Sequence, residues 1–176
     1  MTDSRLDLSA PRHLVVIRHG EAKASSASGD EGRELTAGGR KDAEQAGRWL
    51  VEQGISPDVA LVSSATRTQR TWEALQAGGV TAEDVRVDSS IYNGSVEDVM
   101  EALGSVPDSA RVVLVVAHSP AVPEIAYQVD ADCDVPEGWA PATVGVIALT
   151  GEWSDGIADA TLVACRTPTR ARGLVD

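Results

Sequence analysis

The chain has 176 residues, 43% of them hydrophobic, and this length and composition predict one folded domain rather than a disordered polypeptide. Its net charge of −12, from 15 basic and 27 acidic residues, argues against a nucleic-acid-binding surface, which needs a basic stripe. No apolar stretch is long enough to span a bilayer, residues 1–12 lack the apolar centre of a signal peptide, and two cysteines argue against a disulfide framework, so we expect a cytoplasmic protein.

The first predicted element is a buried strand, Leu14 to Ile17, which is followed by Arg18, His19 and Gly20. An arginine and a histidine directly after an apolar run point to a ligand, because open α/β sheets bind ligands at the carboxyl ends of their strands. Gly20 removes a side chain where the backbone has to approach that ligand closely. We interpret His13, which precedes the strand, as a surface residue.

Residues 21–34 are rich in Ser, Gly and charge, and we predict that they form a mobile loop over the end of this strand. A helix with small residues on one face is expected between Thr36, its N-cap, and Gly54. A short apolar strand follows at 59–62. The serine pair Ser63-Ser64 is predicted to cap the next helix.

The second half of the chain continues the alternation of strand and helix. A strand is predicted at 85–87, and Ser95 with Asp98 forms the capping box of a helix. The run 112–116 is apolar on both faces, which is typical of a central parallel strand. A further helix is predicted over 119–129, although two prolines leave its start open.

Two last strands, at 143–149 and 157–164, are predicted to form an antiparallel hairpin at the edge of the sheet. Because strand and helix alternate up to residue 129, we predict an α/β fold, a three-layer α/β/α sandwich with a mostly parallel sheet. We expect one domain over 1–176, with its core at about 12–165 and loose ends at 1–11 and 167–176.

Three predicted strand ends carry residues that suit an anion: Arg18 with His19, then Arg67, then His118. Arg67 falls in the first turn of its helix, where the positive end of the helix dipole disfavours a cation. An anion between Arg67 and the free N–H groups of that helix would reverse this cost. The set predicts phosphoryl transfer through a covalent phosphohistidine, in which arginines hold the phosphoryl oxygens and His118 donates a hydrogen bond to them.

Four segments together resemble the histidine phosphatase superfamily: LVVIRHGEA at 14–22, RELTAGGRKDAEQAGRWL at 33–50, SSATRTQRTWEAL at 63–75 and VVAHSP at 115–120. Their order and spacing are similar to its small phosphohistidine phosphatase branch, of the SixA type. The resemblance covers roughly residues 12–165 and implies a phosphoglycerate mutase-like fold with no metal and no cofactor.

The resemblance also implies roles for individual residues. His19 is the phosphorylated nucleophile, and Arg18, Arg67 and His118 complete the phosphate pocket. Arg33, at the family's R-x-L-T position, is expected to add a substrate contact.

The chain departs from the family around the second histidine, which Ala117 and Ser119 flank. The family usually has Gly before this histidine and Asn or Glu after it. Ala117 would crowd the pocket if its backbone needs a positive φ, and Ser119 would replace an Asn hydrogen bond only in part. Pro123 is expected to disturb the helix that follows. These departures predict low activity or an unusual substrate.

Hydrolysis of an alkyl phosphate needs a general acid for its poor leaving group. Larger members of the superfamily supply this acid from an inserted region, for which the chain is too short. Glu21 is the candidate donor here. A phosphoramidate needs less help, because imidazole leaves readily from phosphorus. The sequence therefore favours phosphohistidine in a protein, with a small phosphomonoester as the other candidate substrate.

Two other functions stay open: a phosphoryl-binding regulatory module of the same fold without catalysis, and, ranked lower, a mutase. A metal site is not expected, because neither histidine has a His or carboxylate three or four residues away, and the arginines would repel a cation. Besides a phosphate-bearing partner we expect no nucleic acid and no membrane, and a monomer or weak dimer. With a net negative charge, phosphate binding must depend on locally concentrated arginine.

Overall fold

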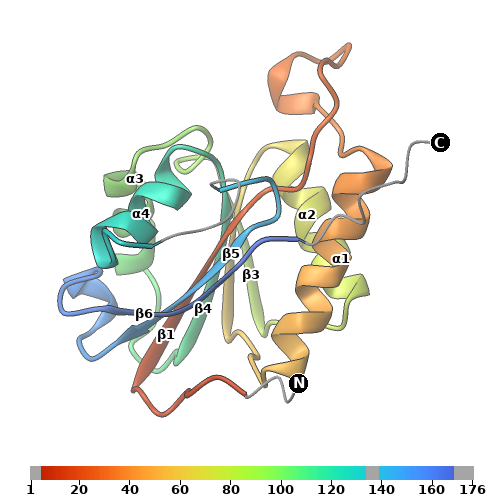
Figure 1. Cartoon of the computed structure of the whole chain (residues 1–176). Helices are drawn as coiled ribbons and strands as arrows, with labels where there is room; N and C mark the ends of the chain where they lie inside the picture. Colours follow the sequence, from red (N-terminus) through yellow and green to blue (C-terminus); the bar gives the residue numbers. More distant parts are fainter. Residues whose placement is uncertain (1–4, 134–138, 169–176) are drawn as a thin grey trace.

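Six strands form one sheet in the order β3-β2-β4-β1-β5-β6, as seen in the computed structural model, which describes residues 5–133 and 139–168 (Figure 1). The strands that come first in the chain pair in parallel, whereas β5 pairs antiparallel with β1 and β6 antiparallel with β5. The strands are β1 (Arg12–Arg18), β2 (Val59–Ser63), β3 (Asp84–Asp88), β4 (Val112–Ala117), β5 (Val144–Leu149) and β6 (Thr161–Arg166).

Helices cover both faces of this sheet, which confirms the predicted three-layer sandwich (Figure 1). One face is covered by α1 (Ala37–Glu52) and α2 (Thr66–Ala77), and the other by α3 (Val96–Gly104) and α4 (Ala121–Val129). Two 3-10 turns, η1 (Asp30–Gly32) and η2 (Trp153–Asp155), lie in connecting segments.

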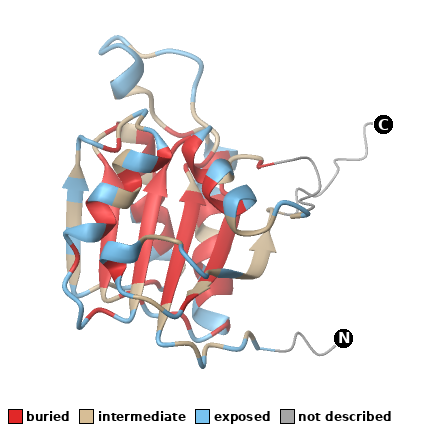
Figure 2. Cartoon of the chain, turned by 90° about the vertical axis from the view of Figure 1, so that its left-hand side faces the viewer, coloured by how far each residue is buried: buried red, intermediate tan, exposed pale blue. Residues whose placement is uncertain are grey.

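The central strand β1 is buried on both faces, as its apolar sequence predicts (Figure 2). Leu14 and Val16 pack with the residues of α3 and α4, while Val15 and Ile17 pack with those of α1 and α2. His13 is buried too, with 3% of its surface exposed, so its interpretation as a surface residue is wrong. The strand starts earlier than expected, and it pairs His13 with β4 and β5.

Two of the predicted helix starts are confirmed and one is wrong. The Thr36 hydroxyl accepts a hydrogen bond from the Gly39 N–H at 3.0 Å, and Ser95 with Asp98 forms the capping box of α3. No side chain caps α2, which begins after Ala65. Ser63 instead ends β2 and bonds to His118, while Ser64 donates to Glu31. Both serine side chains are therefore engaged elsewhere.

The prolines of α4 do not disturb it, contrary to the expectation for Pro123. This proline is the third residue of the helix. Backbone N–H groups in the first turn have no intrahelical acceptor, so the N–H that proline lacks breaks no hydrogen bond of the helix. Ala117 ends β4 and is not among the residues with a positive φ, so its methyl group causes no backbone strain. The last strand begins later than predicted, at Thr161, because η2 and the turn residues after it occupy the chain up to Ala160.

The ends of the chain are partly anchored. The Leu6 N–H donates to the Gln53 side chain at 2.9 Å, and Leu6 and Leu8 pack against the core, although we predicted that 1–11 would be loose. Residues 1–4 and most of the predicted loose end at 167–176 lie outside the described residues. Within 5–133 and 139–168, no helix is both long and apolar enough to cross a membrane.

Candidate active site

The parallel pairing brings the carboxyl ends of β1, β2, β3 and β4 to one edge of the sheet. β1 and β4 are neighbours in register, with Arg18 opposite Ala117, so His19 and His118 follow at adjacent strand ends. The His19 N–H donates to the Ala117 carbonyl at 3.0 Å, and the two imidazole rings lie 5.3 Å apart. The sheet therefore fixes the separation of the two histidines.

An open cavity of about 900 Å³ lies at this edge. All seven residues that the sequence singled out line it, together with four others that it did not. The lining residues are Arg18, His19, Glu21, Ala22, Asp30, Arg33, Arg67, Asn93, His118, Ser119 and Pro141.

The ring of His19 is held in one tautomer. Its Nδ1 atom lies 2.7 Å from the carbonyl oxygen of Gly20, and a carbonyl oxygen can only accept, so Nδ1 carries the proton. The Nε2 atom then keeps its lone pair. With 9% of its surface exposed, His19 offers this nitrogen as a nucleophile in a largely dry setting.

The ring of His118 is held by Ser63. The Ser63 hydroxyl and His118 Nε2 lie 2.7 Å apart and both side chains are buried. If the hydroxyl donates, Nδ1 carries the proton and can donate to a third group. Among the described residues, this buried Nδ1 atom has no partner. His118 is therefore oriented by the protein while one of its ring nitrogens remains available.

Both imidazoles are neutral at neutral pH. Burial lowers the pKa of His19 to about 4, partly offset by the hydrogen bond to Gly20, and the charges of Arg67, Arg18 and Arg33 lower it further. Burial also lowers the pKa of His118 to about 3, followed by the effects of His19 and Arg67. Because the rings are neutral, His19 keeps its lone pair at physiological pH.

These shifts predict how stability depends on pH. The unfolded chain binds protons on both histidines below about 6.5, whereas the folded chain does not until about 4. The free energy of unfolding should therefore fall between pH 6.5 and pH 4, with a slope approaching about 1.4 kcal/mol per pH unit for each histidine. Urea unfolding at pH 7.5, 6 and 5 measures this slope.

The matched variant for this measurement is His19→Gln, which removes one of the two titrating rings. Its unfolding free energy should fall less steeply with acid than that of the wild type. Equal slopes in the two proteins would contradict the shift assigned to His19.

Arg67 contributes the most buried cation of the cavity, with 3% of its side chain exposed. Its guanidinium donates to the carbonyl oxygen of Asp30 at 3.0 Å and more weakly to the Asp30 carboxylate and the Asn93 side chain. Arg18 donates to the carbonyl of Trp139. Within the described part of the chain, the buried Nε atoms of Arg18 and Arg67 have no partner. Arg18 is thus held through Nη1, and Arg67 through both Nη1 and Nη2.

The loop between β1 and α1 projects beyond the sheet and is mostly exposed (Figures 1 and 2). It is nevertheless tied to the cavity, although we predicted it to be mobile. The Asp30 carboxylate accepts from Arg33 at 2.9 Å, from the Tyr92 hydroxyl at 2.7 Å and from Arg67 at 3.3 Å. The 3-10 turn η1 is thus hydrogen-bonded to side chains from α2 and from the segment after β3.

Sequence reasoning missed Asp30, Tyr92, Asn93 and Ser63. The rule that ligands bind beyond the carboxyl ends of strands could have found Tyr92 and Asn93, which follow β3. Nothing in the sequence marks Asp30 among the many acidic residues. The sequence also did not reveal a packing reason for Gly20: a Cβ atom there would meet the Gly39 carbonyl oxygen of α1 at 2.6 Å.

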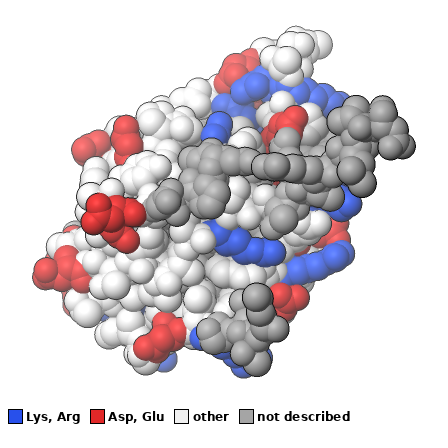
Figure 3. Space-filling model, in the orientation of Figure 1, with Lys and Arg blue, Asp and Glu red and all other residues white. Residues whose placement is uncertain are grey.

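Arg70, one turn after Arg67 on α2, does not line the cavity. It forms ion pairs with Glu34 and Glu73 at the surface. Figure 3 shows Asp and Glu side chains on the left of the face drawn and Lys and Arg side chains mainly toward its upper and right parts, where further Asp and Glu side chains lie among them. The positive charge of the cavity comes from Arg18, Arg33 and Arg67, in a chain with a net charge of −12.

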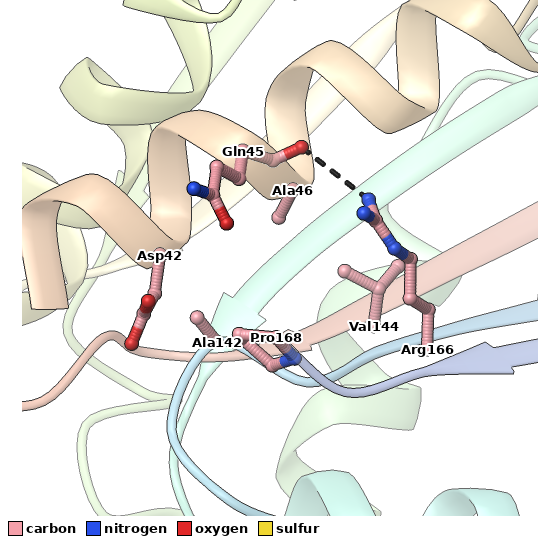
Figure 4. A pocket seen from close by; sticks show the side chains of 7 residues that line it. All are labelled: Asp42, Gln45, Ala46, Ala142, Val144, Arg166 and Pro168. Carbon is pink, nitrogen blue, oxygen red and sulfur yellow. Dashed lines mark hydrogen bonds between the residues drawn. The ribbon is translucent and has the colours of Figure 1, made fainter. Parts of the chain in front are cut away.

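A second, smaller hollow of about 200 Å³ lies between α1 and the end of β6 (Figure 4). Arg166 crosses its edge and donates to the Gln45 carbonyl at 3.4 Å. Figure 4 shows mostly small or apolar side chains around it, and none of the predicted site residues. In the parts of the chain that are described, no cluster of three His, Cys, Asp or Glu side chains could hold a metal ion.

Comparison with known proteins agrees with this geometry. Residues 14–91 match the model of the histidine phosphatase superfamily (branch 1). The structure of "Putative Phosphohistidine Phosphatase SixA" from Nakamurella multipartitia is 34% identical, with a TM-score of 0.76 over 90% of this chain and 97% of that one. The protein histidine phosphatase SixA complexed with tungstate has a similar fold, with a TM-score of 0.75 at 22% identity, over 89% of this chain and 97% of that one. The Mycobacterium tuberculosis protein Rv1276c is 27% identical over 147 residues, which span 79% of this chain and 90% of the relative.

Proposed function

The chain belongs to the histidine phosphatase superfamily and has its phosphoglycerate mutase-like fold, and from this premise we propose that it is a phosphatase that works through a phosphorylated His19. The observation that carries the proposal is the pair of buried, neutral imidazoles 5.3 Å apart in a cavity lined by Arg18, Arg33 and Arg67. A neutral nitrogen nucleophile beside several guanidinium groups suits phosphoryl transfer.

In the first step, His19 Nε2 attacks phosphorus in line. A new P–N bond forms with the lone pair of Nε2, and the electron pair of the breaking bond goes to the leaving group. The Gly20 carbonyl keeps Nδ1 protonated and so stabilises the positive charge that grows on the ring. In the second step, water attacks the phosphohistidine and releases phosphate, which restores the neutral imidazole.

The arginines act on the phosphoryl oxygens. Arg18 and Arg67 are the proposed ligands of the non-bridging oxygens, and Arg33 is a further substrate contact at the mouth of the cavity. His118 donates from Nδ1 when Ser63 donates to its Nε2. Groups that are already oriented before charge develops give the largest electrostatic stabilisation.

We propose phosphohistidine in a protein as the substrate class. Two considerations support it: the similarity to SixA, whose name describes a protein histidine phosphatase, and the smaller need of a phosphoramidate for a general acid. Glu21 and Ser119 line the cavity, and we assign them to substrate binding. An imidazole leaving group places less demand on such an acid than an alkoxide does.

Inhibition by vanadate tests this mechanism. Vanadate adopts the five-coordinate geometry of the transferring phosphoryl group, so it should inhibit turnover of both p-nitrophenyl phosphate and a phosphohistidine peptide. EDTA should leave both rates unchanged, since the proposed mechanism uses arginines where other phosphoryl-transfer enzymes use magnesium. Rates measured over pH 5 to 8 with each reagent check this expectation.

Loss of activity in EDTA, restored by a divalent cation, would overturn the metal-independent mechanism. Binding of phosphate in a calorimeter without turnover of either substrate would instead identify the chain as a phosphoryl-binding module.

A further inference from the structure

Asp30 is a carboxylate of the cavity that forms ion pairs with two of the arginines predicted to bind the substrate, Arg33 and Arg67. It lines the cavity at the start of η1, and 52% of its side chain is exposed. Oδ1 accepts from Arg33, whereas Oδ2 accepts from both Tyr92 and Arg67. These donors come from three separate segments, so the position of the carboxylate is determined by the fold.

This carboxylate is ionised at every pH at which the protein would work. The hydrogen bond from Tyr92 lowers the pKa of Asp30 to about 2; desolvation opposes this shift, and the charges of Arg67 and Arg33 lower the pKa further. An ionised carboxylate accepts hydrogen bonds and donates none. Asp30 therefore cannot protonate a leaving oxygen, and its charge repels one on which negative charge develops.

The opposite holds for a phosphorylated imidazole. Such a ring leaves most readily when its other nitrogen is protonated, because cleavage of the P–N bond then releases neutral imidazole. The proton stays on the distal nitrogen, and the electron pair of the P–N bond becomes the lone pair of the nitrogen that carried phosphorus. A carboxylate that accepts a hydrogen bond from that distal N–H stabilises the reactive, protonated ring.

Arg67 contacts Asp30 and also lines the cavity that contains His19. Its guanidinium lies 3.3 Å from Asp30 Oδ2. A phosphoryl group bound by Arg67 would therefore lie in the cavity that Asp30 also lines. Resting on the proposed function, we propose that Asp30 is a specificity-determining residue that accepts the distal N–H of the leaving imidazolium and so selects P–N over P–O substrates.

The substitution Asp30→Asn tests this inference with two substrates, a phosphohistidine peptide and p-nitrophenyl phosphate. With the peptide, kcat/KM should fall about tenfold, the factor expected for one charge-assisted hydrogen bond. With the ester, kcat/KM should stay constant or rise, because a repelling charge has been removed. The peptide activity of the variant should also be lost at a lower pH than that of the wild type, since the ring is held less firmly in its protonated form.

The matched control is Glu31→Gln, which removes the same charge from the next residue. Glu31 pairs with Ser64 and does not line the cavity, so the ratio of the two kcat/KM values should match the wild type. Asp30→Glu, which keeps the charge, should recover part of the preference for the peptide.

An equal loss on both substrates in Asp30→Asn would overturn the inference, because it would mean that Asp30 only positions Arg67. Failure of the proposed function gives a different result: the wild type itself would turn over neither substrate. Thermal unfolding of each variant separates both outcomes from a loss of folding.

Discussion

Replacement of His19 by alanine should abolish turnover of every phosphorylated substrate, with a loss on the order of 10⁴-fold or more, as found when a nucleophile is removed. His19 Nε2 is the atom that forms the proposed covalent bond, and the hydrogen bond from Nδ1 to the Gly20 carbonyl fixes the orientation of its ring. Steady-state rates with p-nitrophenyl phosphate and a phosphohistidine peptide measure the loss. Acid-labile labelling of the protein by a radioactive phosphoryl donor should disappear with it.

The matched control is His13→Gln, which changes a buried histidine near the start of β1, the strand that His19 follows. This variant should retain its label and its activity even if its unfolding temperature falls. Hydrolysis at the wild-type rate by the His19→Ala protein would remove the proposed mechanism, whatever the fate of the control.

Replacement of Arg67 by alanine is expected to have the next largest effect, a drop in kcat of about 10²- to 10³-fold, typical of losing one pre-oriented donor to a developing charge. The Arg67 side chain is 3% exposed, and its guanidinium donates to Asp30 of η1 and lines the cavity. The affinity for inorganic phosphate should fall with kcat, which calorimetry can measure. Lysine at this position should recover only part of the rate, because an ammonium group cannot bind two oxygens side by side.

Arg70→Ala provides the control on the same helix. Arg70 pairs with Glu34 and Glu73 and lies outside the cavity, so kcat and phosphate affinity should stay within about twofold of the wild type. Comparable losses in the two alanine variants would mean that the overall positive charge of α2, not the position of Arg67, governs binding.

The sequence predicted the layers of the fold because hydrophobic periodicity reports directly on burial. The runs at 14–17 and 112–116 are apolar at every position, and both lie in the central strands β1 and β4, which pair in parallel with each other. The predictions that failed concern residues whose partners are distant in sequence. Ser63 was predicted to cap a helix from its position alone, but its hydroxyl bonds to His118, 55 residues later.

The site residues that follow the ends of strands could be predicted from the sequence, whereas those in loops could not. His19, Arg67 and His118 interrupt strand or helix patterns, so each of them was marked by its local context. Asp30 violates no local rule in a polar loop. Its hydrogen bonds with Arg67 and Tyr92 depend on the conformation of that loop. Residue propensities and hydrophobic periodicity do not predict such a conformation.

The fit of Gly20 against Gly39 couples the reacting nitrogen to the docking of an entire helix. The loop that carries His19 and the start of α1 touch backbone to backbone, with no side chain between them to absorb a displacement. Any change that shifts α1 on the sheet, including one at its buried Trp49, is therefore transmitted to the imidazole. Since a misplacement of about 1 Å can cost a large part of a rate, sensitivity to mutation extends along this helix well beyond the residues that meet the substrate.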